Sequence, residues 1–239
     1  MGEHYSKKEL GKDMYQFFIE DENAAEDFVT IEGSDVNHIK NVLRMKPGEK
    51  IRVCTRNGQN YFCSISDITE SFVRADILEK EAESTELPCR IYLFQGLPKN
   101  DKMEWIIQKT VELGVYEVIP VAMKNCVVKL DDKKAKSKVT RWQAIAESAA
   151  KQSKRSLIPE VKMPMSYKEA VAYAKKLDVK LVPYENEHGM AGTKAAMEQI
   201  KKGESIAVFI GPEGGFDEEE IRLALEKNVI PVSLGKRIL

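Results

Sequence analysis

The first eighty residues alternate short apolar runs with polar breaks, a pattern typical of β-strands. An asparagine–glycine pair, Asn57-Gly58, separates two of these runs and favours a tight turn between them. One segment, 34–45, instead spaces its apolar residues as a helix does, with Ser34 expected to cap it and Pro47-Gly48 to end it. The expected strands are 16–19, 28–32, 49–54, 60–65 and 72–78. This half of the chain therefore predicts a small β-barrel carrying one helix.

The pattern changes after a charged stretch that ends in proline. Residues 81–88 are expected to be a linker, so that the barrel spans 14–80 and a second domain spans 89–239. Residues 1–13 are polar and aperiodic, which favours a disordered leader.

The second domain alternates strand and helix patterns, which is typical of an α/β domain with a mostly parallel sheet. The expected strands are 90–96, 116–122, 180–183, 205–210 and 230–234, and the expected helices are 101–113, 141–152, 166–177, 193–201 and 217–227. The charge run 131–138 fits either a solvated loop or the start of a helix.

Three strand ends in this domain carry residues suited to a ligand site: VPYE at 182–185, IGPEGG at 210–215 and SLGKRIL at 233–239. Ligands of open parallel sheets bind outside the carboxyl ends of the strands. The glycine-rich turn at 210–215 is neither a P-loop nor a dinucleotide fingerprint. Asp217 is placed to cap the next helix, and Glu218–Glu220 would repel a phosphate, so a ligand there is expected to be neutral or cationic. Taken alone, the motif favours a tight strand–helix turn with structural glycines.

Basic residues gather in three places. In the barrel they surround the end of the helix, and in the second domain they follow strand ends and the helix 141–152. They could track a polyanion backbone, or they could be solvated surface charges, because each cluster has acids nearby. The basic residues are Lys40, Arg44, Lys46, Lys50, Arg52, Lys99, Lys102, Lys124, Lys129, Arg141, Lys151, Lys154 and Arg155.

Composition narrows the class of protein but assigns no partner. The chain of 239 residues has 37 basic and 38 acidic side chains, which is ordinary for a soluble globular protein. No apolar run is long enough to cross a membrane and no signal peptide is recognisable, so a cytoplasmic protein is expected. The four cysteines and three histidines are scattered, so no metal site is expected and the thiols are expected to be reduced.

Six segments, taken in order, resemble a known family: HIKNVLRM at 38–45, MEWIIQKTVELG at 103–114, CVVKLD at 126–131, AAKQSKR at 149–155, IGPEGG at 210–215 and LGKRIL at 234–239. Together they resemble the bacterial 16S ribosomal RNA uracil-N3 methyltransferases, a branch of the SPOUT methyltransferases. The resemblance implies a PUA-like barrel that binds RNA and a SPOUT α/β domain with a trefoil knot. It also implies a homodimer that methylates N3 of a uridine in 16S rRNA of the small ribosomal subunit.

The resemblance further implies that S-adenosyl-L-methionine binds at the three strand ends. The expected cofactor residues are Val182, Pro183, Tyr184, Glu185, Ile210, Gly211, Pro212, Gly214, Gly215, Leu234, Gly235, Ile238 and Leu239. An arginine suits the negative charge that develops on the uracil carbonyls, so Arg155 and Arg237 are the catalytic candidates, with Glu213 as a positioning group. The expected RNA-binding residues are Lys40, Arg44, Lys46, Lys102, Lys151, Lys154 and Arg155.

Two departures from the family pattern leave alternatives open. Asn125 stands where many relatives carry an arginine, and the chain stops at Leu239, where relatives continue. The second departure suggests a truncated C-terminus and an incomplete knot. A catalytically idle RNA-binding protein is therefore one alternative, and a SPOUT enzyme that modifies transfer RNA is another.

Overall fold

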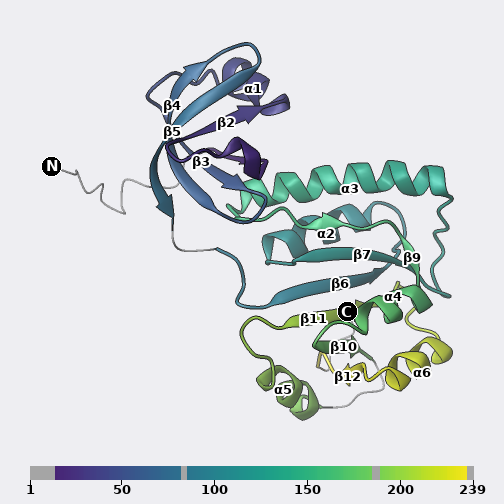
Figure 1. The fold of residues 1–239 in the computed structure, drawn as a ribbon. Helices are drawn as coiled ribbons and strands as arrows, with labels where there is room; N and C mark the ends of the chain where they lie inside the picture. The colour runs from purple at the N-terminus through teal and green to yellow at the C-terminus, as the bar shows by residue number, and fades with distance from the viewer. Residues whose placement is uncertain (1–13, 82–84, 185–188, 236–239) are drawn as a thin grey trace. The chain divides into compact units, whose positions relative to one another are not determined.

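The computed structural model describes residues 14–81, 85–184 and 189–235 (Figure 1). The chain divides into two compact units. The barrel unit contains the residues up to Glu86 together with Lys154–Ile158, and the sheet unit contains Leu87–Ser153 and the residues from Pro159 onward. The expected leader 1–13 lies outside the described residues.

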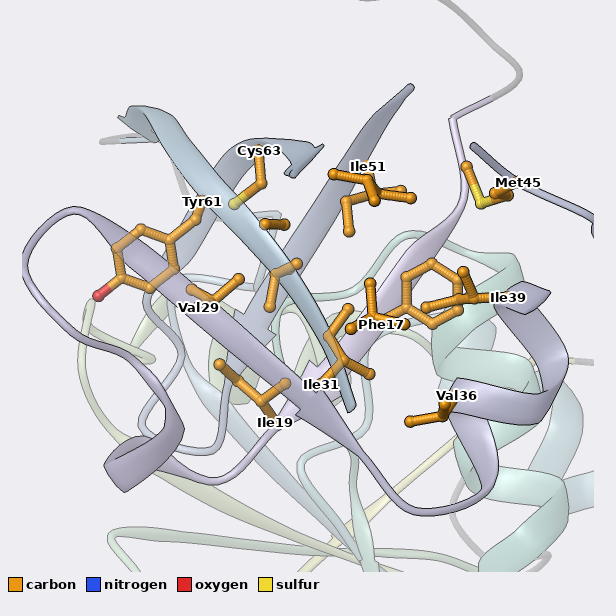
Figure 2. Packing of buried hydrophobic residues seen from close by; sticks show 14 residues of the cluster. Phe17, Ile19, Val29, Ile31, Val36, Ile39, Met45, Ile51, Tyr61 and Cys63 are labelled. Atoms are coloured by element: carbon orange, nitrogen blue, oxygen red, sulfur yellow. The ribbon is translucent and has the colours of Figure 1, made fainter. Parts of the chain in front are cut away.

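The barrel unit is a five-stranded curved sheet in the order β1-β3-β4-β5-β2. Strand β1 runs parallel to β3, and the other neighbours are antiparallel. Figure 2 shows the core, where alternate strand residues such as Val29, Ile31 and Ile51 meet the side chains of Val36 and Ile39. The strands are β1 (Gln16–Ile19), β2 (Phe28–Glu32), β3 (Lys50–Thr55), β4 (Asn60–Ile68) and β5 (Phe72–Glu81). All five expected strands are present, and β4 and β5 run three residues further than predicted.

The helix of the barrel unit differs from the prediction. Helix α1 covers only Ser34–Asn37 and continues as a single π-helical turn, η2 (His38–Val42). Its N-cap is Gly33, whose φ of 71° suits a residue without a side chain, so the expected cap by Ser34 is wrong. The helix also ends well before Pro47, because Arg44 adopts a left-handed backbone with a φ of 54°.

A short piece of chain from the middle of the sequence belongs to the barrel unit. In this return segment, Lys154–Ile158, the backbone carbonyl of Arg155 accepts a hydrogen bond from Gln16 Nε2 at 2.5 Å. The carbonyl of Lys154 accepts another from Arg52 at 3.1 Å, and Asn60 Nδ2 donates to Ser156 Oγ at 2.7 Å. The expected domain ranges 14–80 and 89–239 placed these residues in the second domain, whereas the structure places them in the barrel unit.

The sheet unit has a fully parallel sheet in the order β12-β10-β11-β6-β7-β8, with β9 also pairing with β7. The expected parallel α/β architecture is therefore confirmed. The strands are β6 (Arg90–Gly96), β7 (Glu117–Ala122), β8 (Glu160–Val161), β9 (Met165–Ser166), β10 (Val179–Pro183), β11 (Ser205–Ile210) and β12 (Ile230–Val232). The helices are α2 (Lys102–Glu112), α3 (Asp132–Gln152), α4 (Tyr167–Ala174), α5 (Ala191–Glu198) and α6 (Glu218–Glu226).

Helix α3 begins nine residues earlier than the expected helix 141–152. The side chain of Asp131 caps it by accepting a hydrogen bond from Lys134 N at 2.8 Å. The charge run is therefore a helix start, one of its two expected structures, and its buried Ala135 begins the apolar stripe that continues through Trp142 and Ala146.

Candidate cofactor site

The three strand ends singled out in the sequence belong to adjacent strands. Strand β10 lies between β12 and β11, with Pro183 opposite Val232 and Leu181 opposite Val208. Because all three strands are parallel, their carboxyl ends share one edge of the sheet. The backbone N–H of Tyr184 donates to the carbonyl of Val232 at 3.0 Å, which joins the first loop to the end of β12, where the third loop begins.

The structure describes ten of the thirteen expected cofactor residues at this edge. They are Val182, Pro183, Tyr184, Ile210, Gly211, Pro212, Gly214, Gly215, Leu234 and Gly235. Glu185, Ile238 and Leu239, together with the catalytic candidate Arg237, lie outside the described residues.

The glycine-rich loop after β11 packs directly on the end of β6. A methyl group built on Gly96 would lie 2.7 Å from the backbone nitrogen of Pro212, so only glycine permits this approach. The loop then turns tightly, with Gly215 N donating to Pro212 O at 2.9 Å and Gly215 at a φ of 70°. The close packing and the tight turn thus explain the glycines structurally. Because glycines lack side chains, they also leave the main-chain groups of the loop uncovered at the edge of the sheet.

Helix α6 starts with the predicted cap. The side chain of Asp217 accepts a hydrogen bond from Glu219 N at 3.0 Å, and Glu220 accepts one from Asp217 N at 3.0 Å, which completes a capping box. Lys124, in the loop after β7, forms an ion pair with Asp217 at 2.9 Å. This ion pair lowers the pKa of Asp217, so part of the acidic charge at the helix start is balanced.

The loop after β12 is fixed by a threonine of α5. Thr193 Oγ1 donates to Ser233 O and accepts from Ser233 N, both at 2.9 Å, and Thr193 is buried. Gly235 N donates to Ser233 Oγ at 3.2 Å, and Gly235 adopts a φ of 97°. The hydroxyl of Thr193 thus sets the direction in which the third loop leaves the sheet.

Replacing Thr193 by valine is expected to lower the free energy of unfolding of the sheet unit by about 2 kcal/mol. The variant keeps the side-chain shape but leaves a buried N–H and C=O of Ser233 without their partner. Urea unfolding followed by tryptophan fluorescence measures the change, because Trp105 and Trp142 both lie in the sheet unit. T193S keeps the hydroxyl and should retain most of the stability; equal losses in both variants would contradict the proposed role of the hydroxyl.

Glu213 is tied to the loop that follows β6. Its carboxylate accepts from Lys99 N at 3.2 Å and pairs with Lys102 Nζ at 2.8 Å. The hydrogen bond from Lys102 is the main cause of the lowered pKa of Glu213, so this carboxylate is ionised at neutral pH. The expected positioning role of Glu213 stays a prediction. Lys102, one of the expected RNA-binding residues, forms an ion pair with this carboxylate.

Arg155 occupies a different environment from the expected one. Its side chain is 4% exposed, and its guanidinium forms a salt bridge with Glu86, with Nε 3.1 Å from a carboxylate oxygen. The salt bridge indicates a structural role for Arg155 within the barrel unit, and its expected catalytic and RNA-binding roles stay predictions.

The remaining RNA candidates lie on the surface or at half-buried positions. Arg44, Lys46 and Lys102 are exposed, whereas Lys40 is half-buried and pairs with Glu70. Lys151 pairs with Glu147 at 3.0 Å, and Lys154 is half-buried in the return segment. Their contact with RNA stays a prediction.

The described residues contain neither a metal site nor a membrane-spanning helix. Within residues 14–81, 85–184 and 189–235, no group of three His, Cys, Asp or Glu side chains is arranged to hold a metal ion. The helices in these same ranges include none that combines the length and the apolar character needed to span a bilayer.

Comparison with known proteins identifies the class. Residues 85–239 match the RNA methyltransferase domain family, and residues 31–78 match the RNA methyltransferase PUA domain family. The two units therefore define an RNA methyltransferase with a PUA domain, which confirms the expected fold class. The knot itself stays a prediction, since its expected final residues lie outside the described ranges.

Individual relatives narrow the class to a family. The chain is 38% identical to Ribosomal RNA small subunit methyltransferase E of Bacillus subtilis (strain 168) over 213 residues, which cover 88% of this chain and 83% of that protein. This chain belongs to the ribosomal RNA small subunit methyltransferase E family, so the resemblance noted in its sequence is confirmed.

Solved structures agree with this assignment. A crystal structure described as a hypothetical protein has a TM-score of 0.88 and 37% identity, covering 94% of this chain and 91% of its own. A Ribosomal RNA small subunit methyltransferase E from Neisseria gonorrhoeae, solved bound to S-adenosyl methionine, has a TM-score of 0.79 and 33% identity, covering 95% and 91% respectively.

Proposed function

We propose that this protein transfers a methyl group from S-adenosyl-L-methionine to N3 of a uridine in 16S rRNA of the small ribosomal subunit. One observation carries the proposal: in a member of this family, three adjacent parallel strands end in loops that leave bare backbone at one edge of the sheet. Family membership does not favour the catalytically idle alternative.

The space and the charge around the loops support S-adenosyl-L-methionine as the ligand. Among the described residues, a methyl group built on Gly215 meets no heavy atom within 4 Å and one built on Gly235 meets Met190 Sδ at 4.0 Å, so this part of the chain leaves room beside both backbones. The ionised Glu213 and the acidic start of α6 suit a ligand that carries a positive sulfonium. The ten described loop residues would hold the cofactor. We also include Glu185, Ile238 and Leu239 in the proposed cofactor-binding set.

The chemistry requires alignment, proton removal and charge stabilisation. When bound, the cofactor supplies an electrophilic methyl group. N3 of uridine carries a proton and is a poor nucleophile while it does, so the chain must align N3 and assist the loss of that proton. We assign stabilisation of the charge on the uracil carbonyls to Arg237, with Arg155 as the second candidate, and positioning to Glu213.

The barrel unit is proposed to bind the RNA backbone. Arg44 and Lys46 are exposed around the end of η2, and Lys40 lies on the same turn. We retain Lys102, Lys151 and Lys154 as further RNA contacts, and we place the reaction in the cytoplasm. Lysine and arginine side chains neutralise phosphates without reading sequence, which suits a role in positioning the substrate.

We also propose that the protein is a homodimer. Two large apolar side chains, Trp105 on α2 and Leu113 just after it, are 64% and 76% exposed, which leaves apolar surface that a second subunit would cover. Light scattering should report twice the chain mass of 27.1 kDa, whereas a single chain mass at micromolar concentration would reject the dimer.

Incubation with labelled S-adenosyl-L-methionine tests the function. Label should enter 16S rRNA of small subunits, and mass spectrometry of nuclease fragments should place it on N3 of one uridine. RNA binding without transfer would support the idle alternative. Label in transfer RNA instead of 16S rRNA would support the transfer-RNA enzyme.

A further inference from the structure

We infer that Asn125 is a positioning residue that holds the glycine-rich loop after β11 in the shape that binds the cofactor. The inference rests on the proposed function, because it assigns to Asn125 a role at the same site. Asn125 lies in the loop after β7, and it was not among the expected site residues.

The amide of Asn125 bridges two consecutive carbonyl groups. Its Nδ2 donates to the carbonyl of Gly214 and to the carbonyl of Gly215, both at 3.2 Å. The two hydrogens of a carboxamide nitrogen allow one side chain to satisfy two acceptors. Because peptide groups are planar, fixing these two carbonyls also fixes the orientation of the two peptide units that contain them.

The two loops are also in van der Waals contact. A methyl group built on Gly214 would lie 3.2 Å from Cβ and 3.4 Å from the carbonyl oxygen of Asn125. Glycine at 214 therefore lets the Asn125 side chain come close enough to reach both carbonyls. The absence of a side chain at Gly214 and the carboxamide of Asn125 are therefore both needed for these two hydrogen bonds.

The contact with Asn125 holds the C-terminal end of the loop, at Gly214 and Gly215. Its near end is held by the packing of Pro212 on Gly96, and Glu213 is held by Lys99 and Lys102. Gly214 and Gly215 follow, and glycine loses more conformational freedom on ordering than any other residue. Together with the hydrogen bond from Gly215 N to Pro212 O, Asn125 thus orders two consecutive glycines of the loop before the cofactor arrives, which reduces the entropic cost of binding.

Two substitutions distinguish positioning from a general structural effect. N125A removes both hydrogen bonds and is expected to raise Kd for S-adenosyl-L-methionine about fivefold. N125D keeps the size but places a carboxylate against two carbonyl oxygens, so Kd should rise more than in N125A, by about twentyfold. In methyl transfer, KM for the cofactor should rise in the same order, while KM for RNA stays unchanged.

Calorimetry with S-adenosyl-L-methionine and hydrogen exchange of the free protein provide the readouts. Amides of 213–216 should exchange faster in both variants, whereas V127A, which shortens a 68% exposed side chain in the same loop, should match the wild type in both experiments. Wild-type affinity and exchange in N125A and N125D would overturn the inference. If the wild-type chain binds no cofactor, the proposed function fails, and the exchange experiment still decides whether Asn125 orders the loop.

Discussion

Substituting Gly96 by alanine is expected to reduce the affinity for S-adenosyl-L-methionine at least tenfold and to destabilise the sheet unit. The new methyl group would lie 2.7 Å from the nitrogen and 2.8 Å from Cδ of Pro212, and 3.0 Å from the carbonyl carbon of Gly211. Two of these three atoms are backbone, so the loop after β11 has to move away from the end of β6. Overpacking of this kind costs about 1–3 kcal/mol, and the displaced loop no longer presents Gly211–Gly215 as observed.

Calorimetry and urea unfolding measure the two effects of G96A, and another glycine provides the matched control. Gly192 lies in α5, and a methyl group built there meets no heavy atom of the described residues within 4 Å. G192A should therefore leave cofactor affinity unchanged and stabilise the helix slightly, because alanine is the better helix former. Wild-type affinity in G96A would show that the contact between Gly96 and Pro212 does not shape the site.

Removing the guanidinium of Arg155 is expected to lower the free energy of unfolding of the barrel unit by about 3 kcal/mol. The R155A variant removes the guanidinium that pairs with the Glu86 carboxylate, and breaking a buried ion pair carries a penalty of this size. Both tryptophans lie in the sheet unit, so hydrogen exchange measured on peptides of β3, β4 and β5 is the suitable readout. These peptides should lose protection, while those of β10 and β11 keep it.

A second arginine of the same unit gives the control for R155A. Arg56 pairs with Glu20 at 2.7 Å, but the two side chains are 74% and 51% exposed. R56A should therefore change protection very little, because exposed pairs contribute little to stability. If R155A instead keeps full protection and abolishes methyl transfer, the structural role is wrong and the catalytic role predicted from the sequence is supported.

The sequence was most informative where a signal is local. Alternating patterns located β1 and β2 and the strands β6 and β11 to the residue, and Asp217 was recognised as a cap from its position before an acidic first turn. Helix α1 was predicted less well, because its apolar spacing also fits a π-helical turn and because the left-handed backbone of Arg44 ends it early. Neither feature has a recognisable sequence signal.

The sequence predicted the loops of the candidate site but not the residues that hold those loops in place. Glycine and proline at three strand ends indicated the loops, and the parallel sheet then placed those strands side by side. Asn125, Thr193 and Gly96 were missed because each acts on a residue 40 or more positions away, which no local pattern shows. The salt bridge of Arg155 was missed for the same reason, since its partner Glu86 lies 69 residues earlier.

The return segment has a consequence for how the protein is made. Gln16, Arg52 and Asn60 take partners from Lys154–Ile158, so a fragment ending at Glu86 contains every barrel strand but lacks part of the unit. On the ribosome, the barrel cannot be completed until about seventy further residues have emerged. The first unit to be translated thus finishes folding only after β6, β7 and α3 have been synthesised, which couples the maturation of the two units in time.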